Sequence, residues 1–360
     1  MPPPHRQPEA FRQHLLAFYD QHGRDLPWRQ VTTPYAIWLS EIMLQQTTVA
    51  TVKPYFWRFL EAFPTVHDLA RATEQEVLTL WQGLGYYSRA RNLHACAKTV
   101  VAAWDGQFPT TTEDLLKLPG IGPYTAAAIA AIAFNAQATV VDGNVERVIS
   151  RLYRLATPLP KAKTEIRPLA TALTDPARPG AYAGAIMDLG ATVCTPRSPS
   201  CAECPVQRWC AGYAAGDQAT YPRKEPKAKR PEKTGVAWCI FDRHGRLYLR
   251  QRPAKGLLAS LWEVPHTGWE EHAPPLPEIA QYHAAEAVDA GQIRHVFTHF
   301  GLTLDVRRLD LPTEQPDWVS PATLARHPLP TLMRKVLHRA LAEADPQPSK
   351  KRATGAKERR

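Results

Sequence analysis

Two acidic residues of this chain have neighbours that could shift the pKa values of their side chains. The first is Glu41, in TTPYAIWLSEIMLQQT, where Thr33 is predicted to cap a helix that begins at Pro34. Glu41 then lies about two turns into the helix, on the same face as Ile37, Trp38 and Leu44. Burial raises the pKa of a carboxyl group, so Glu41 could deliver a proton near neutral pH. The alternative is a structural glutamate paired with an arginine.

The second acid is Asp142, where an apolar run meets a predicted helix with an apolar face of Val145, Val148, Ile149 and Leu152. Asp142 would cap that helix, and the positive end of a helix stabilises an ionised carboxylate. Capping alone would also explain the residue. If both acids serve chemistry, their surroundings should push their pKa values apart, which is the arrangement expected for cleavage of a glycosidic bond.

Four of the six cysteines fall within seventeen residues, in the order Cys194-x6-Cys201-x2-Cys204-x5-Cys210. Such clustering predicts one metal centre in a reducing compartment, and a Cys-x2-Cys pair can supply two of its ligands. The spacing alone fits zinc or an iron–sulfur cluster. The two remaining cysteines stand alone and are predicted to be packing residues, namely Cys96 and Cys239.

A glycine-rich turn in the segment LPGIGPYTAAAIAAIAF is predicted to join two helices. Thr112 could cap the first, over 113–118, and Pro123 suits the first turn of the second, over 124–135. Because Gly120 and Gly122 have no side chains, a phosphate could approach the backbone and the positive end of the second helix. The alternative is a plain helical hairpin whose glycines only turn the chain.

The composition is that of a globular protein that binds a polyanion. The chain has 360 residues, a formal charge of +10, 44% hydrophobic and 22% charged residues, so two domains are expected. No apolar run is long enough to span a membrane, and residues 1–8 lack the apolar core of a secretory signal. We therefore expect a cytoplasmic, nucleoid-associated monomer, because the positive charge favours nucleic acid as a partner.

Changes in composition predict a multidomain organisation. Residues 9–215 are expected to form an all-α domain that includes the cysteine loop, 194–210. A basic, proline-rich and solvated linker follows over 216–234, and an α+β domain over 235–344 opens with a hairpin made of 236–241 and 247–249. The last residues, 345–360, are predicted to be a disordered basic tail.

Four segments together resemble one family of repair enzymes. LPGIGPYTA is similar to the helix-hairpin-helix of the endonuclease III superfamily of DNA glycosylases, and WLSEIMLQQT to its catalytic helix. VDGNVERV resembles the segment that carries the essential aspartate, and the cysteine spacing resembles a 4Fe-4S loop. The resemblance implies that Glu41 is the catalytic acid, that Asp142 is the essential carboxylate with Asn144 supporting it, and that the four cysteines bind a 4Fe-4S cluster.

The hairpin points to the MutY family within this superfamily. Bifunctional members carry a lysine in the hairpin that forms a Schiff base with the sugar. Here that position is Tyr124, which cannot form an imine and is typical of MutY-like proteins. We expect Tyr124 to hydrogen-bond near the leaving base or Asp142; an aromatic residue packed in the core is the alternative.

Further residues take roles from the resemblance alone. Gln46 and Tyr86 match residues that wedge into the base stack, and three others match residues that line the base pocket, namely Trp28, Leu44 and Val49. The sequence departs from the family at Ala183-Gly184, where a polar pair is usual. That departure puts the contacts to adenine in doubt, but not the reaction.

The C-terminal domain resembles a Nudix fold through GLLASLWEVP, but it lacks the acidic helix that a Nudix hydrolase needs for its metal ions. It is therefore expected to bind rather than hydrolyse. The segment HVFTHF is similar to the family's loop that senses 8-oxoguanine, which implies that Phe297, Thr298 and His299 contact that base. An ordinary alternating strand is the other interpretation.

The resulting hypothesis is a monofunctional glycosylase that binds duplex DNA at an 8-oxoguanine:adenine or guanine:adenine mispair, flips out the adenine and hydrolyses it, leaving an abasic site. One alternative is an endonuclease III-like enzyme for oxidised pyrimidines, which should have lysine at position 124 and no Nudix-like domain. The other is an iron–sulfur DNA-binding protein without catalysis, which would not need both Glu41 and Asp142.

Overall fold

A computed structural model describes residues 3–226, 229–267 and 275–342 and divides the chain into two compact units, 1–227 and 228–360. Within the described residues, no helix is both long and apolar enough to cross a membrane. The basic tail predicted over 345–360 lies outside the described residues.

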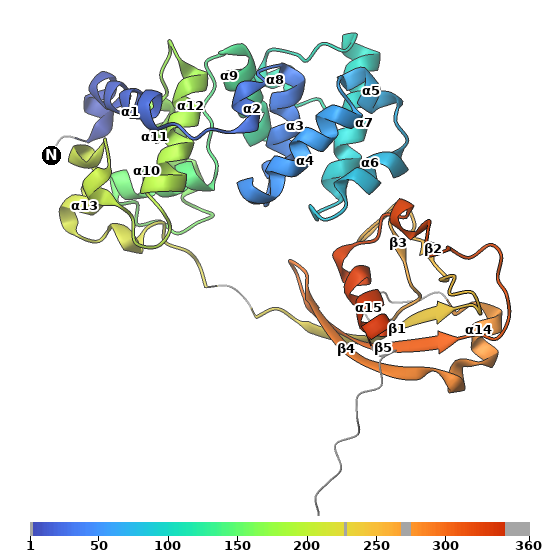
Figure 1. Cartoon of the computed structure of the whole chain (residues 1–360). Coiled ribbons are helices and arrows are strands. Elements are labelled where there is room, and N and C mark those ends of the chain that lie inside the picture. The colour runs from blue at the N-terminus through green and yellow to red at the C-terminus, as the bar shows by residue number, and fades with distance from the viewer. Residues whose placement is uncertain (1–2, 227–228, 268–274, 343–360) are drawn as a thin grey trace, which may run out of the picture. The chain divides into compact units, whose positions relative to one another are not determined.

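The first unit is helical (Figure 1). Its α-helices are α1 Pro8–His22, α2 Pro27–Gln30, α3 Pro34–Leu44, α4 Val49–Ala62, α5 Val66–Arg71, α6 Glu74–Trp81, α7 Ser88–Trp104, α8 Thr112–Leu115, α9 Pro123–Phe134, α10 Gly143–Tyr153, α11 Lys163–Leu173, α12 Pro179–Asp188 and α13 Ala211–Ala215. Short 3-10 turns lie at Pro4–Arg6, Cys201–Glu203, Gln207–Trp209 and Gln218–Thr220, and a π turn, Leu189–Val193, continues α12.

The helix starts that matter for the site follow local rules. The Thr33 hydroxyl accepts a hydrogen bond from the Ala36 N–H at 3.2 Å, with Pro34 as the first residue of α3. Asp142 caps α10 through its side chain. Both starts confirm the sequence-based prediction, because a cap needs only the residues within one turn of it.

The first helix of the hairpin differs from its prediction. Thr111, not Thr112, is the cap, because Thr111 has the extended backbone and its hydroxyl accepts from the Asp114 N–H at 3.2 Å. The helix expected over 113–118 is therefore the single turn α8. The second helix agrees closely with its prediction: Pro123 begins α9, and Asn135 ends it in the left-handed conformation.

Small residues let the helices around the site pack closely. Five alanines of α9 are buried, namely Ala126, Ala127, Ala128, Ala130 and Ala131. The helix contacts α3 on one side and α12 on the other. A second core joins α1, α10 and α12 through buried apolar side chains that include Phe11, Leu15, Ile149, Ile186 and Trp209. Helices far apart in sequence thus pack closely against one another around the site.

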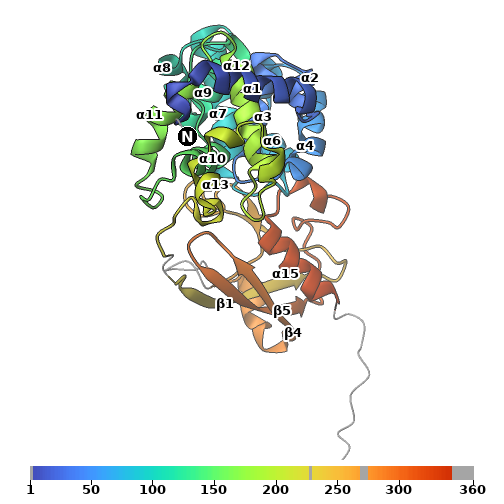
Figure 2. The same cartoon turned by 90° about the vertical axis from the view of Figure 1, so that its left-hand side faces the viewer.

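The second unit is an α+β fold. A three-stranded sheet has the order β1-β5-β4, formed by β1 Glu232–Phe241, β5 Gly301–Asp310 and β4 Val288–Val296. β1 pairs parallel with β5, and β4 pairs antiparallel with β5. Helix α15, Thr331–Ala342, crosses one face of the sheet (Figures 1 and 2) and packs Met333, Val336 and Ala340 against it. The remaining elements are β2 Arg250–Gln251, β3 Trp262–Glu263, α14 Glu278–Tyr282 and 3-10 turns at Ala284–Glu286 and Leu324–Arg326.

The hairpin predicted to open this unit is reduced to a bridge. Phe241 pairs with Leu247, but β1 has its full ladder with β5, some sixty residues further along the chain. The parallel ladder is favoured over the local hairpin because it buries Ala237, Cys239 and Leu304 under α15. Cys239 and Cys96 are both buried, as predicted for packing residues.

The region predicted as a solvated linker is partly built into the first unit. Tyr221 is buried, and its carbonyl accepts from Arg151 Nε at 3.1 Å. Lys224 forms a bridge with Leu159. A tyrosine in a charged, proline-rich stretch provides enough apolar area to fold the chain back, which composition alone did not indicate. The strand β1 then begins at Glu232, inside the predicted linker.

Candidate active site

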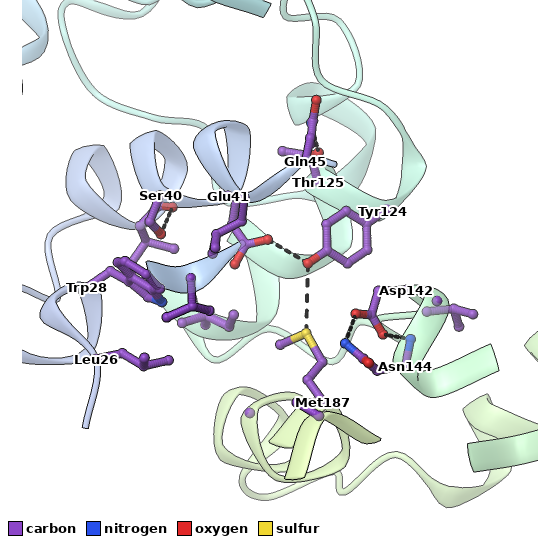
Figure 3. A pocket seen from close by; sticks show the side chains of 18 of the residues that line it. Leu26, Trp28, Ser40, Glu41, Gln45, Tyr124, Thr125, Asp142, Asn144 and Met187 are labelled. Carbon is purple, nitrogen blue, oxygen red and sulfur yellow. Dashed lines mark hydrogen bonds between the residues drawn. The ribbon is translucent and has the colours of Figure 1, made fainter. Parts of the chain in front are cut away.

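A pocket of about 820 Å³ opens in the first unit between α3, α9, α10 and α12. Figure 3 shows side chains from these helices meeting in it. It brings together ten of the residues singled out in the sequence, namely Trp28, Glu41, Leu44, Gln46, Val49, Gly120, Gly122, Tyr124, Asp142 and Asn144. Separate segments spanning more than a hundred residues therefore share one cavity.

Glu41 is buried in the wall of this pocket, with 5% of its surface exposed. The Tyr124 hydroxyl donates a hydrogen bond to its Oε2 at 2.7 Å (Figure 3). Burial is the main cause that raises the pKa of Glu41 from 4.5 to about 7, and the charge of Asp142 adds to it. The Tyr124 hydrogen bond and Arg29 lower it by less. Glu41 can therefore carry a proton at neutral pH.

The structure does not favour the alternative of a glutamate paired with an arginine. Arg29 is near enough to act on Glu41 electrostatically, but its guanidinium is bound to Asp188, with Nη1 2.8 Å from Oδ2. Arg24 shares the same carboxylate at 2.6 Å. Among the described residues, no arginine forms an ion pair with Glu41. No paired cation therefore holds Glu41 in its ionised form.

Tyr124 faces Glu41 rather than Asp142. Its hydroxyl lies 2.7 Å from the glutamate and 3.8 Å from the sulfur of Met187. Burial and the two nearby carboxyl groups raise the pKa of Tyr124 well above 10, so the phenol stays protonated. Tyr124 thus orients Glu41. Of the two expected partners, the leaving base and Asp142, Asp142 is not bonded to its hydroxyl.

Asp142 presents its carboxylate at the start of α10. Oδ1 accepts from the N–H groups of Asn144 and Val145 at 2.9 and 2.8 Å, and Oδ2 accepts from Asn144 Nδ2 at 2.8 Å. Burial nevertheless raises the pKa of Asp142, which these hydrogen bonds oppose. The two acids are therefore distinguished by their partners: Asp142 is the one surrounded by N–H donors, which favour its ionised form.

A chain of hydrogen bonds leads from Asp142 to the cysteine loop. Asn144, which donates to Asp142, accepts through Oδ1 from Arg147 Nη2 at 2.8 Å. Arg147 Nε in turn donates to the carbonyl of Cys194 at 2.7 Å. The loop thereby positions the helix start that carries Asp142.

The four clustered cysteines form no disulfide and line one small cavity. Arg151 Nη1 donates to Cys194 Sγ at 3.2 Å and to the carbonyl of Thr195 at 2.8 Å, which ties the loop to α10. In the part of the chain that the structure describes, no group of His, Cys, Asp or Glu side chains is arranged to hold a single metal ion. Four thiols spread around a shared cavity fit the ligand set of an iron–sulfur cluster.

The glycine turn before α9 lines the pocket. Gly120 has φ +75°, and a Cβ there would lie 2.6 Å from Asn92 Cβ, so only glycine suits this position. Gly122 precedes the first helical residue, and a Cβ there would meet nothing within 4 Å. Its backbone therefore borders open space, where a phosphate could reach the N–H groups of α9.

Gln46 and Tyr86 occupy two exposed turns with left-handed backbones, at φ 55° and φ 46°. Tyr86 does not line the pocket; 48% of its surface is exposed outside it. Buried Arg89 joins the turns, because Nη1 donates to the Ile42 and Met43 carbonyls at 2.9 Å and Nη2 to the Gly85 carbonyl at 3.2 Å. Arg89 thus holds together two turns, each of which exposes a side chain on a strained, left-handed backbone.

In the second unit, Phe297, Thr298 and His299 form the loop between β4 and β5, not part of a strand. Phe297 N–H donates to the Phe300 carbonyl at 2.9 Å, and their rings lie 4.7 Å apart. Thr298 and His299 are exposed. The loop therefore presents polar groups beside a partly buried aromatic pair, whereas the alternating-strand interpretation fails after Val296.

Several residues of the pocket were not predicted from the sequence, among them Tyr19, Arg29 and Met187, together with Asp188, which binds Arg29. An acid in the apolar segment AIMDLG was a usable signal, because a buried carboxylate needs cationic partners from elsewhere in the chain. Arg24 and Arg29 supply them. Tyr19 and Met187 carried no signal, since methionine and tyrosine are common in any core.

Family models match three parts of the chain. One, described as HhH-GPD superfamily base excision DNA repair protein, matches residues 39–170. A model of the iron-sulfur binding domain of endonuclease III matches 194–210, and one of the NUDIX domain matches 236–339. These matches confirm the predicted fold class, a helical glycosylase domain with an iron–sulfur loop followed by a Nudix-like domain.

The chain is also similar to curated proteins over most of its length. It is 39% identical to the adenine DNA glycosylase of Rattus norvegicus over 85% of this chain and 72% of that protein. It is 39% identical to that of Homo sapiens over 85% of this chain and 68% of that protein.

Two solved structures resemble the first unit. A thermostable thymine-DNA glycosylase matches with a TM-score of 0.54 and 30% identity, covering 58% of this chain and 98% of that one. Endonuclease III in a non-covalent complex with DNA matches with a TM-score of 0.51 and 23% identity, covering 59% and 97%, which shows the fold alone.

Proposed function

The chain belongs to the adenine DNA glycosylases, a MutY-type family of base excision repair enzymes, and we propose that it acts on adenine mispaired with 8-oxoguanine or guanine. It removes adenine from DNA and carries a 4Fe-4S cluster. The observation that supports the mechanism below is one pocket holding a buried acid, Glu41, and a carboxylate with N–H donors, Asp142.

In the proposed reaction, adenine is rotated out of the duplex into the pocket, because its glycosidic bond cannot be attacked within the stack. Glu41 transfers its proton to N7, which makes the base a better leaving group. Its pKa of about 7 means that a large share is protonated at neutral pH. Tyr124 holds the carboxyl group in place through its 2.7 Å hydrogen bond.

As the C1′–N9 bond breaks, its electron pair leaves with the base and positive charge develops on the sugar. Ionised Asp142 stabilises this oxocarbenium-like state, with Asn144 fixing its orientation. Water then adds to C1′ and loses a proton, which leaves an abasic site. Asp142 is suited to this role because its hydrogen-bond donors favour the charged form.

The enzyme is proposed to be monofunctional, since position 124 holds a phenol and not an amine. One assay separates the candidate functions: base release from duplexes with 8-oxoguanine:adenine, guanine:adenine and thymine glycol, with borohydride added to trap covalent adducts. Release of adenine without a trapped adduct supports the proposal, whereas release of thymine glycol would favour an oxidised-pyrimidine enzyme. Protein that binds these duplexes and releases no base would not be an enzyme of this kind.

The DNA is proposed to be held around the pocket mouth. The N–H groups beside Gly120 and Gly122 would bind a backbone phosphate at the start of α9, and Gln46 and Tyr86 would fill the gap left by the flipped base. Trp28, Leu44 and Val49 would line the space for the base itself.

Cys194, Cys201, Cys204 and Cys210 are proposed as the cluster ligands, because the four thiols share a cavity. Purified protein should be yellow-brown with about four irons per chain. Cys204→Ser should lower the iron content and the visible absorbance, while Cys96→Ala, a buried cysteine outside the loop, should keep both. Colourless, fully active protein with one zinc per chain would contradict the assignment.

The Nudix-like unit is proposed to read the base opposite adenine. 8-Oxoguanine differs from guanine by an oxygen at C8 and a hydrogen on N7, so its reader needs polar atoms matched to that edge. The exposed loop of Phe297, Thr298 and His299 offers a hydroxyl and an imidazole beside an aromatic ring.

Loss of this reader should reduce discrimination more than catalysis. Thr298→Ala should reduce the preference for 8-oxoguanine:adenine over guanine:adenine by about fivefold, since one hydrogen bond contributes about 1 kcal/mol. A chain of residues 1–227, one of the two compact units, should still release adenine but lose most of the preference. The measurement is the ratio of single-turnover rates on the two duplexes.

The matched control is Thr331→Ala, which removes an exposed hydroxyl at the start of α15 in the same unit and should leave the ratio unchanged. An unaltered ratio in the 1–227 chain would place recognition in the helical unit instead.

A further inference from the structure

Tyr19, on α1, lines the pocket but has no role in the reaction proposed above. The guanidinium carbon of Arg29 lies 5.1 Å from the centre of its ring. Arg29 in turn is close enough to Glu41 for each to shift the pKa of the other. Tyr19 therefore belongs to the same region of the pocket as the acid.

Gly184, on α12, makes room for the Tyr19 hydroxyl. A Cβ added to Gly184 would lie 2.5 Å from Tyr19 Oη and 2.9 Å from Cζ, closer than real Cβ contacts. Gly184 itself lines the pocket. Any other residue at position 184 would displace the phenol, so the two residues act as one steric unit that fixes where the hydroxyl lies.

The hydroxyl is available for a ligand. Burial raises the pKa of Tyr19 above 10, so the group stays a neutral phenol. Within the described parts of the chain, no hydrogen bond joins this hydroxyl to another residue. A polar group that lines a pocket and has no protein partner is satisfied by water or by the molecule that fills the pocket.

We infer that the Tyr19 hydroxyl, positioned by Gly184, is a specificity-determining contact that accepts a hydrogen bond from the 6-amino group of adenine. The inference rests on the proposed function. In adenine, N7 and the 6-amino group lie on the same edge of the ring system. A base that meets Glu41 through N7 therefore turns its amino group toward neighbouring side chains, and Tyr19 is a neighbour with a free acceptor.

The test compares adenine with unsubstituted purine, which has hydrogen in place of the amino group, each opposite 8-oxoguanine. Tyr19→Phe should slow single-turnover release of adenine about fivefold, the usual effect of one lost hydrogen bond. It should leave purine release unchanged, so the adenine-to-purine ratio falls about fivefold. Gly184→Ala should also lower the adenine-to-purine ratio, because the added methyl group displaces the Tyr19 hydroxyl. If Tyr19→Phe does not fold, Gly184→Ala serves as the test.

Tyr182→Phe is the matched control. Tyr182 lies on α12 two residues from Gly184, is buried without a hydrogen bond to its hydroxyl, and does not line the pocket. The adenine-to-purine ratio of Tyr182→Phe should equal that of the unaltered protein. If Tyr19→Phe slows both bases equally or neither, Tyr19 is structural and the inference is wrong. If the unaltered protein releases no adenine from 8-oxoguanine:adenine or guanine:adenine duplexes, the proposed function fails and this contact with it.

Discussion

Glu41→Gln is expected to slow single-turnover release of adenine by about three orders of magnitude, within the range that general acid catalysis contributes. An amide has the size of the acid and can still accept the Tyr124 hydrogen bond, but it has no proton to give to N7. Binding to the mispaired duplex should change little. The two measurements are single-turnover release and affinity for a duplex whose adenine cannot be cleaved.

The pH dependence gives this prediction a second readout. Because burial raises the pKa of Glu41 to about 7, the protonated form should predominate below that pH, and the rate of the unaltered enzyme should fall as pH rises through it. Glu41→Gln should lose this descending limb. Glu165→Gln, an exposed residue of α11, should behave like the unaltered enzyme. A near-normal rate in Glu41→Gln would show that another group protonates the base.

Asp142→Asn is expected to slow adenine release by about a hundredfold to a thousandfold, the usual effect of removing a group that stabilises developing charge. The asparagine Oδ1 can still accept from the N–H groups of Asn144 and Val145, so the start of α10 should persist. What disappears is the negative charge proposed to face the sugar, together with the acceptor for Asn144 Nδ2. Single-turnover release at saturating enzyme measures this directly, without the contribution of product dissociation.

A matched control exists elsewhere in the same unit. Asp175 caps a turn with the same geometry, because its Oδ1 accepts from the N–H groups of Ala177 and Arg178 at 2.9 and 2.8 Å. It lies outside the pocket. Asp175→Asn should therefore keep the full rate. Similar losses in both variants would mean that Asp142 serves only to cap its helix.

Features that depend on one turn of chain could be predicted from the sequence. Thr33 before Pro34, and Asp142 before an amphipathic helix, identify their helix starts because the atoms that satisfy each cap lie within three residues. The positions of Glu41 and Asp142 along their helices follow directly. Local rules fail where two neighbouring residues suit the same role. Thr111 and Thr112 are both threonines, so the sequence alone could not show which of them caps α8.

Features that depend on distant contacts could not be predicted. The hydrogen bond between Tyr124 and Glu41 joins residues 83 apart, so no periodicity in either segment indicates it. β1 likewise pairs parallel with the distant strand β5 and does not form the local hairpin that its sequence suggests. Tyr221 likewise is buried, and its carbonyl accepts a hydrogen bond from Arg151, which lies 70 residues away in the sequence. Each outcome depends on tertiary packing, which local patterns do not contain.

A compact catalyst engineered from this protein would need more chain than its cavity suggests. The last residue to line the pocket is Ala191, so a designer guided by the cavity would end the scaffold there. Yet Arg147 and Arg151 brace α10 against carbonyl groups that follow, as far as Tyr221. Shortened at Ala191, the scaffold would keep every wall of the pocket and lose the brace behind Asp142. The smallest sound design therefore includes some thirty residues that do not line the pocket.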